Sequence, residues 1–363
     1  MNKRLLFLLT LVSSAYIIPG NASIVIAQGG GLGGNLSTYV ANNNYIYDGA
    51  PNNRPSLTIF RDTIKLICYL QNTQVAVFEY NTGLPIQYSC PVTDSQHNNV
   101  YWDGDFDHVN GGNSPSNDVL FLGGVVINLY QTWYGIPVLK DSNNNPLKLN
   151  MLIHWPADNA YWDTTNMVMF FGNGVKYFFP LVSLGVGAHE ISHGFTQQNS
   201  NLVYAGQSGG LNESFSDMSA MAAEYFTTLT NTWEIGHEVF KSTNRAIRYM
   251  QTPSTDCNFN GKKNPTPGDL CSIDNANQYF NGLDVHYSSG VFNRAFFLIA
   301  NSSGWNTQNA FNIMVQANRF YWIPNTTWVE AACNVITATH DFGYSDAAVR
   351  IAFNTVGIST SGC

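Results

Sequence analysis

Hydrophobic and polar residues follow different patterns in the two halves of the chain. From residue 29 to about 115, short apolar runs such as 57–60 and 75–78 are separated by Gly, Asn, Asp and Thr, which is typical of β-strands joined by turns. Apolar residues then recur at helical spacing over about 118–134, which predicts a helix. The first half is therefore expected to be rich in strands and to contain a long helix.

Two more strands are expected at 148–154 and 167–171, and 175–179 is predicted to pair with the second of these across a Gly-Asn-Gly turn. After Pro180, helical spacing dominates. Helices are expected at 181–198, 212–228, 234–250, 289–301, 307–320, 327–339 and 344–356. Together these patterns predict an α+β chain with a β-rich first half and an α-helical second half, divided near residue 180.

The N-terminal residues 1–22 have the order of a secretory signal peptide. Lys3 and Arg4 precede an apolar run at 5–12, and cleavage is expected between Ala22 and Ser23. The run is shorter than the roughly 20 residues that span a bilayer as a helix, so an uncleaved anchor is the less favoured alternative. No later segment has about 18 uninterrupted apolar residues. We therefore expect a mature chain that is secreted, extracellular and without a membrane partner.

Composition narrows the class of partner. The chain of 363 residues carries 16 basic and 24 acidic side chains, a formal net charge of −8, and only 11% charged residues, against about 25% in an average soluble domain. Such a chain lacks the basic surface that nucleic acids and anionic membranes require, so neither is an expected partner. Its 44% hydrophobic residues suffice for a sizeable core.

Six cysteines are dispersed along the chain without a Cys-x-x-Cys pair. In an exported protein an even, dispersed set indicates disulfides rather than a zinc cluster. Six cysteines allow about fifteen pairings, and we hypothesise the pairing that is local in sequence because its loops are short. It joins Cys68 to Cys90, Cys257 to Cys271, and Cys333 to Cys363.

The stretch with the clearest chemistry is Ala188-His-Glu-Ile-Ser-His193. On a helix His189 and His193 project from the same face one turn apart, so both imidazoles can bind one metal ion, and Glu190 lies next to the first of them. Catalytic zinc takes three protein ligands and keeps one position for water. The alternative for the two histidines alone is a pair of surface residues on a core helix.

Two carboxylates further along the chain suit the same site. Glu213 lies twenty residues after His193 in a second expected helix, which a short connection allows to return beside the first. Asp217 is one turn beyond Glu213 on the same face. There it is expected to accept the free N–H of His189, because metal-bound histidines usually donate to such a carboxylate. The alternative is that both are solvated surface acids.

Six sequence blocks carry a resemblance to a known family. They are Asp158-Asn-Ala-Tyr-Trp162, Pro180-Leu-Val-Ser-Leu184, His189-Glu-Ile-Ser-His-Gly-Phe195, Gln207-Ser-Gly-Gly-Leu-Asn-Glu-Ser-Phe-Ser-Asp217, Arg248-Tyr-Met250 and Gly282-Leu-Asp-Val-His-Tyr-Ser-Ser-Gly290. With these blocks in order, the chain from about Gly29 to the C-terminus resembles the thermolysin-like neutral zinc metalloendopeptidases, most closely their pseudolysin (bacterial elastase) branch. A metzincin would need a third histidine where Asn199 stands.

The resemblance implies a two-domain fold and a role for each matching residue. Residues 29–180 would form a β-rich peptidase domain and residues 181–363 an α-helical one, with the zinc-binding helix at their interface. The implied site consists of the zinc ligands His189, His193 and Glu213, the general base Glu190, the oxyanion donors Tyr204 and His286, the carboxylate of Asp284 that orients His286, and the substrate-binding residues Asn159, Ala160 and Arg248. For Arg248 a structural salt bridge is the alternative.

The resemblance also implies an activity. It is that of a secreted, monomeric zinc endopeptidase that cleaves proteins and peptides on the amino side of bulky hydrophobic residues. Two alternatives are a catalytically inactive, secreted binding protein and another zinc hydrolase such as an aminopeptidase. A complete set of ligands, base and donors argues against the first, and the lack of a recognisable motif that anchors an N-terminal amine argues against the second.

The chain departs from the family pattern in two ways. Gly185, Met221 and Thr232 stand where carboxylate ligands of a stabilising calcium ion are expected, and of that set only Glu224 remains. Calcium takes about six to eight oxygen ligands, several from carboxylates, so we expect this site to be weak or absent. Only a few residues separate the expected cleavage site from Gly29, so the long propeptide typical of the family is either omitted from this sequence or not needed for folding.

Overall fold

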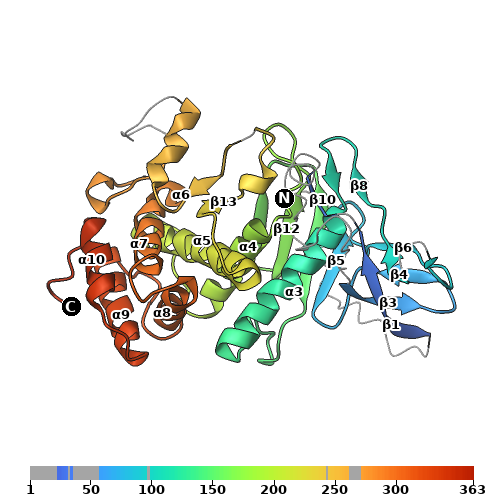
Figure 1. Cartoon of the computed structure of the whole chain (residues 1–363), viewed down its shortest axis with the longest axis horizontal. Coiled ribbons are helices and arrows are strands. Elements are labelled where there is room, and N and C mark those ends of the chain that lie inside the picture. Colours follow the sequence, from blue (N-terminus) through green and yellow to red (C-terminus); the bar gives the residue numbers. More distant parts are fainter. Residues whose placement is uncertain (1–22, 32, 36–56, 96–98, 243, 261–270) are drawn as a thin grey trace. The chain divides into compact units, whose positions relative to one another are not determined.

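The structure is a computed structural model of the chain, and it describes residues 23–31, 33–35, 57–95, 99–242, 244–260 and 271–363 (Figure 1). The expected signal peptide at 1–22 lies outside the described residues. The chain divides into two compact units, one made of residues 1–190 and 238–243 and the other of 191–237 and 244–363. The division falls within a continuous helix, α4 (Leu184–Gln198).

The first unit is built mainly of strands, as expected. They are β1 (Ile24–Gly30), β2 (Gly34–Asn35), β3 (Leu57–Asp62), β4 (Ile67–Tyr69), β5 (Val75–Glu79), β6 (Gln87–Ser89), β7 (Tyr101–Trp102), β8 (Phe106–Asp107), β9 (Gly112–Asn113), β10 (Leu149–Trp155), β11 (Ala160–Asp163) and β12 (Val168–Gly172). The described strands form sheets in the orders β6-β4-β3-β1-β7, β2-β9-β8 and β11-β12-β10-β5. In the last of these β10 runs parallel to β5 and β12, while β11 is antiparallel to β12 and forms an edge.

Helix α3 (Pro115–Tyr134) packs on the four-stranded sheet (Figure 1). Its close approach depends on Gly123, where a Cβ would lie 2.7 Å from Met151 and 3.0 Å from Val75. The helix has Pro in its first turn and ends before Gly135, whose φ of 65° suits glycine. The helix expected at 118–134 is confirmed, and it begins slightly earlier than expected.

The strand expected at 175–179 is wrong. The antiparallel partner of β12 is β11 instead, and residues 175–179 form no strand. The cause is the carboxylate of Asp158, which accepts hydrogen bonds from the backbone N–H groups of all four residues 175–178. Each backbone N–H is a single donor, and N–H groups bonded to this carboxylate are therefore not available for a strand ladder.

The second unit is mainly helical. Besides the end of α4, it contains α5 (Gly206–Thr228), α6 (Val285–Ser288), α7 (Gly290–Ala300), α8 (Thr307–Phe320), α9 (Trp328–Asp341), α10 (Ala347–Thr355), the short strands β13 (Glu234–Ile235) and β14 (Arg248–Tyr249), and the 3₁₀ segments η3 (Pro253–Asn260) and η4 (Ala276–Gln278). In its core, the ring of Phe215 contacts those of Phe195, Phe311 and Trp322. The expected helices of this half are confirmed, except one.

The helix expected at 234–250 is wrong. Within this stretch Gly236 and Asn244 have φ values of 68° and 60°, which a right-handed helix excludes. A short antiparallel ribbon of β13 and β14 occupies this stretch, with the 3₁₀ segment η2 (His237–Val239) between them. The ribbon places Arg248 in the interior, where 9% of the residue is exposed.

Two of the three expected disulfides are confirmed. They are Cys68–Cys90 and Cys333–Cys363. Cys271 is also disulfide-bonded, but the side chain of Cys257, its expected partner, lies outside the described residues. Within the described part of the chain, none of the helices has the length and apolar character needed to cross a membrane.

Candidate active site

Three side chains that can bind a metal converge from helices α4 and α5. His189 and His193 are one turn apart on α4, and Glu213 comes from α5. Each offers one ligand atom, and these three atoms lie within 4.8 Å of one another. No other group of three His, Cys, Asp or Glu side chains in the described ranges meets this spacing. The sequence pattern and the structure thus select the same three residues.

The separation of the ligand atoms suits zinc. Nε2 of His193 lies 3.4 Å from Oε1 of Glu213. Zinc binds imidazole nitrogen and carboxylate oxygen at about 2.0–2.2 Å in a tetrahedral arrangement, which separates two of its ligand atoms by about 3.3–3.5 Å. Two imidazoles and one carboxylate are also a ligand set of catalytic zinc sites. The residues present therefore fit a zinc ion.

The hydrogen bond on the other ring nitrogen of His193 fixes its tautomer. Nδ1 lies 2.8 Å from Oδ1 of Asn212, whose amide in turn donates to the carbonyl of Leu202 at 3.3 Å. An amide oxygen only accepts, so Nδ1 carries a proton, which leaves Nε2 as the ring nitrogen available to a metal ion. Asn212 is absent from the residues predicted from the sequence. Its place directly before Glu213 is the signal that could have found it.

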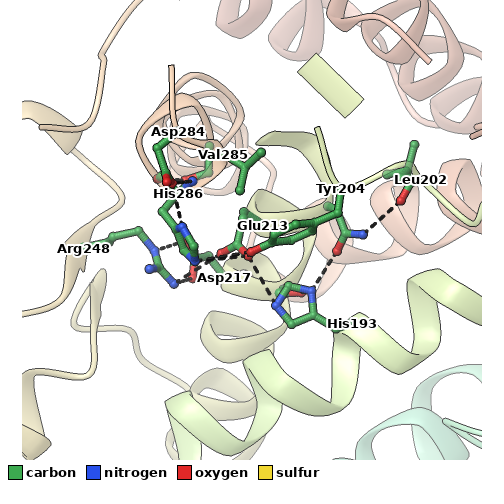
Figure 2. Close-up of polar contacts among 12 residues, drawn as sticks. His193, Leu202, Tyr204, Glu213, Asp217, Arg248, Asp284, Val285 and His286 are labelled. Atoms are coloured by element: carbon green, nitrogen blue, oxygen red, sulfur yellow. Dashed lines mark hydrogen bonds and ion pairs between the residues drawn. The ribbon is translucent and has the colours of Figure 1, made fainter. Parts of the chain in front are cut away.

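Tyr204 and His286 lie beside Glu213 (Figure 2). The Tyr204 hydroxyl donates to Oε1 of Glu213 and lies 3.3 Å from Nε2 of His286. Asp284 caps α6 by accepting the backbone N–H of His286 at 2.9 Å, and the same carboxylate oxygen lies 2.7 Å from Nδ1 of that ring. The structure thus brings both expected oxyanion donors next to a metal ligand, and it sets the expected orienting carboxylate against the His286 ring.

Asp217 is held by two buried donors. Nε and Nη2 of Arg248 each lie 2.6 Å from one of its oxygens, and the Asn293 amide donates to it at 2.8 Å. Burial alone lowers the pKa of Arg248, but the carboxylates of Asp217 and Glu213 raise it, so the guanidinium stays charged. The salt bridge weighed as the alternative for Arg248 is therefore present. Its contact with a substrate, and the hydrogen bond from His189 to Asp217, stay predictions.

Comparison with known proteins identifies the family. The family described as thermolysin metallopeptidase, catalytic domain, matches residues 50–197, and the alpha-helical domain of thermolysin metallopeptidase matches residues 200–358. The chain belongs to the thermolysin family of metallopeptidases. It is similar to a zinc metalloproteinase of Legionella pneumophila (42% identity, covering 85% of this chain and 57% of the relative) and to the hemagglutinin/proteinase of Vibrio cholerae (41% identity, covering 92% and 50%).

A solved structure supports the fold of this thermolysin-family chain. The precursor of protealysin from Serratia proteamaculans matches with a TM-score of 0.62 and 22% identity, over 79% of this chain and 88% of that one. The thermolysin-like two-domain fold expected from the sequence is confirmed. The chain spans 57% and 50% of the lengths of the Legionella and Vibrio relatives.

In this thermolysin-family chain, Asn159 and Ala160 stand where the edge strand β11 begins. β11 pairs with β12 on one side. The N–H of Gly172 donates to the carbonyl of Asn159 at 2.9 Å, and the next pair in the ladder is Ala160 with Phe171. Hydrogen-bonded and non-hydrogen-bonded pairs alternate in an antiparallel ladder. The N–H and C=O of Ala160 therefore point away from β12, toward the open edge.

The region around Glu224, where the sequence predicted a weak or absent calcium site, carries a hydrogen-bonded network. Glu224 accepts from the N–H and the hydroxyl of Thr232, at 3.0 and 3.2 Å, and from the Asn231 amide at 3.3 Å. The Asn231 amide also donates to the carbonyl of Met221 at 2.7 Å. Both oxygens of the Glu224 carboxylate are thus engaged by these donors.

Proposed function

We propose that this chain is a secreted zinc endopeptidase that hydrolyses extracellular proteins on the amino side of bulky hydrophobic residues. The observation that carries the proposal is the convergence of His189, His193 and Glu213, whose ligand atoms lie within 4.8 Å of one another. Membership of the thermolysin family and similarity to proteins named zinc metalloproteinase and neutral protease support it. We expect the protein to act as a monomer.

His189, His193 and Glu213 would hold the metal. When bound, zinc polarises a substrate carbonyl and lowers the pKa of a water ligand to about 7. By accepting a hydrogen bond from Nδ1–H, the Asn212 amide oxygen would leave Nε2 of His193 to bind the metal. Asp217 is proposed to do the same for His189. We also propose that the chain holds no calcium at the network around Glu224.

Glu190 is the proposed general base. It follows His189 on α4, and only 8% of the residue is exposed. Its carboxylate would take a proton from the attacking water and return it to the leaving amine. Tyr204 and His286 would donate hydrogen bonds to the oxyanion that forms on the attacked carbonyl. Removal of one such donor costs about 10²–10³ in rate, and Asp284 holds the His286 ring in position for it.

An extended peptide would bind by adding a strand to β11. The N–H and C=O of Ala160 point to the open edge of the sheet, and main-chain hydrogen bonds of this kind bind an extended peptide whatever its sequence. Asn159 and Arg248 are proposed to make the neighbouring contacts with the substrate backbone. Binding through the backbone suits an endopeptidase, which must accept internal segments of many proteins.

Replacement of Glu190 by Gln tests the proposal. The variant should still bind zinc, and its kcat on casein should fall by about 10²–10⁴, the usual contribution of a general base. Glu330→Gln is the matched control, because Glu330 belongs to a capping box at the start of α9 and Gln serves equally well there. A Glu190→Gln enzyme as active as the wild type contradicts the assigned base. A zinc-loaded wild type without protease activity contradicts the function.

A further inference from the structure

The carboxylate of Asp158 accepts hydrogen bonds from four backbone N–H groups. Oδ1 accepts the N–H groups of Val175 and Phe178 at 2.6 and 3.3 Å, and Oδ2 accepts those of Lys176 and Tyr177 at 2.7 and 3.3 Å. These hydrogen bonds lower the pKa of Asp158 against the opposing effect of burial. One side chain thus fixes a whole turn, residues 173–178, which we call the clamped turn.

The carbonyl groups of the clamped turn are held as well. The Asn110 amide donates to the carbonyls of Asn173 and Gly174 at 3.0 and 3.1 Å. The Lys241 ammonium donates to the carbonyl of Val175 at 3.0 Å and to Oδ1 of Asn110 at 2.6 Å. Gly174 has a φ of 75°, and a Cβ there would lie 2.0 Å from the carbonyl oxygen of Phe178. The clamped turn therefore has little room for another conformation.

Backbone hydrogen bonds join the clamped turn to the segment that leads into β11. The N–H of Asn173 donates to the carbonyl of Trp155 at 2.8 Å, and that of Gly174 to the carbonyl of Ala157 at 3.0 Å. Asp158 follows this segment, and Ala160 comes two residues later at the start of the edge strand. Asp158 therefore links the clamped turn, which its carboxylate binds, to the edge strand β11, which begins two residues further along the chain.

We propose that Asp158 is a positioning residue, which locks the clamped turn against the start of β11 and so fixes the N–H and C=O of Ala160 in the direction that an added peptide strand requires. The inference rests on the proposed function. Strand addition depends on the alignment of several main-chain hydrogen bonds at once. A longer peptide that runs along β11 needs this alignment, whereas a short peptide that reaches only the reacting centre depends on it much less.

The test compares Asp158→Ala and Asp158→Asn with the wild type on a six-residue peptide and on a blocked dipeptide. For the longer peptide, KM should rise about tenfold in Asp158→Ala, which corresponds to about 1.4 kcal/mol, or roughly the net value of one or two hydrogen bonds. Asn keeps one acceptor oxygen for two of the four N–H groups, so the rise should be about threefold there. In both variants the kcat for the longer peptide should stay within about twofold of the wild-type value. The kcat and KM for the dipeptide should do so as well.

Asp141→Ala is the matched control. The Asp141 carboxylate accepts two backbone N–H groups, from Asn143 and Asn145, in a different loop, and its loss should leave both substrates unaffected. If Asp158→Ala does not fold, Asp158→Asn carries the test. An equal fall of kcat/KM for both peptides, or no change in either, overturns the positioning role. A wild type that cleaves neither peptide contradicts the proposed function itself, and the two failures are therefore distinguishable.

Discussion

His154 makes stability depend on pH in a direction that can be worked out from the structure. It lies in β10 at a break in the register with β12. Its Nδ1 is 2.7 Å from Oε2 of Glu79, and its Nε2 is 3.5 Å from Oδ2 of Asp105. Burial alone lowers the pKa of His154, but hydrogen bonds and charge interactions with Asp105 and Glu79 raise it to about 10. The folded chain therefore keeps this imidazolium charged well above neutral pH.

The size of this contribution to stability follows from the difference between the pKa of His154 in the folded chain and its pKa in the unfolded chain. In the unfolded chain the pKa of His154 returns to 6.5. Between pH 6.5 and about 10 the folded state keeps a proton that the unfolded state has lost, so the free energy of unfolding falls as the pH rises. The contribution is complete below pH 6.5 and is lost as the pH rises through about 10. At about 1.4 kcal/mol per pKa unit, its upper limit is on the order of 5 kcal/mol.

Urea denaturation of the wild type and of His154→Gln, in steps from pH 6 to about 10, measures this contribution. Other groups titrate in the same range, including Lys148, whose pKa burial lowers to about 8, but they are present in both proteins and cancel in the difference. The difference in the free energy of unfolding should narrow by several kcal/mol as the pH rises. His108→Gln, which removes a ring packed edge-on against Phe106, is the control. A difference that stays constant, or widens, refutes the reasoning.

Three further outcomes are expected. Arg248→Met leaves the Asp217 carboxylate buried without its cation and should lower the free energy of unfolding, measured by chemical denaturation, by about 3–5 kcal/mol. Arg248→Lys keeps the charge and should lower it less. Equal losses in the two variants would count against the charge as the cause. Asn212→Ala should weaken zinc binding about 10–100-fold in a competition with a chelator, and an unchanged affinity would show that its bond to His193 does not support the metal. Millimolar calcium should shift the midpoint of thermal unfolding by less than about 1 °C, whereas a rise of about 5 °C or more would correspond to 1–2 kcal/mol of binding energy and reveal a calcium site near Glu224.

The helices of the second unit could be predicted because each has a buried face at regular spacing. The helix expected at 307–320 is α8 (Thr307–Phe320), and Asn306 caps it with a side-chain hydrogen bond to the N–H of Asn309. The helical spacing of His189 and His193 likewise places both on one face without any knowledge of the fold. Local periodicity therefore predicts the elements and the ligand pair on α4.

The wrong predictions and the missed residue involve features that the spacing of apolar residues along the chain does not reveal. The segment 175–179 has an apolar, strand-like composition, but Asp158, far away in sequence, binds its N–H groups. The segment 234–250 has helical spacing, but it has positive φ values at Gly236 and Asn244 and contains the ribbon of β13 and β14 instead of a helix. The pairing of Asn212 with His193 likewise depends on how α4 and α5 face each other. The Asp158 contacts and the Asn212–His193 pair are set by tertiary structure rather than by local sequence.

The most direct test of the central claim is the zinc content of the purified chain and of its Glu213→Gln variant, measured by elemental analysis. The account predicts about one zinc ion per wild-type chain, protease activity that a chelator removes and added zinc restores, and a large loss of bound zinc in Glu213→Gln. Glu224→Gln, on the same helix, should keep the metal. A Glu213→Gln protein that binds zinc as fully and as tightly as the wild type would contradict the three-ligand site.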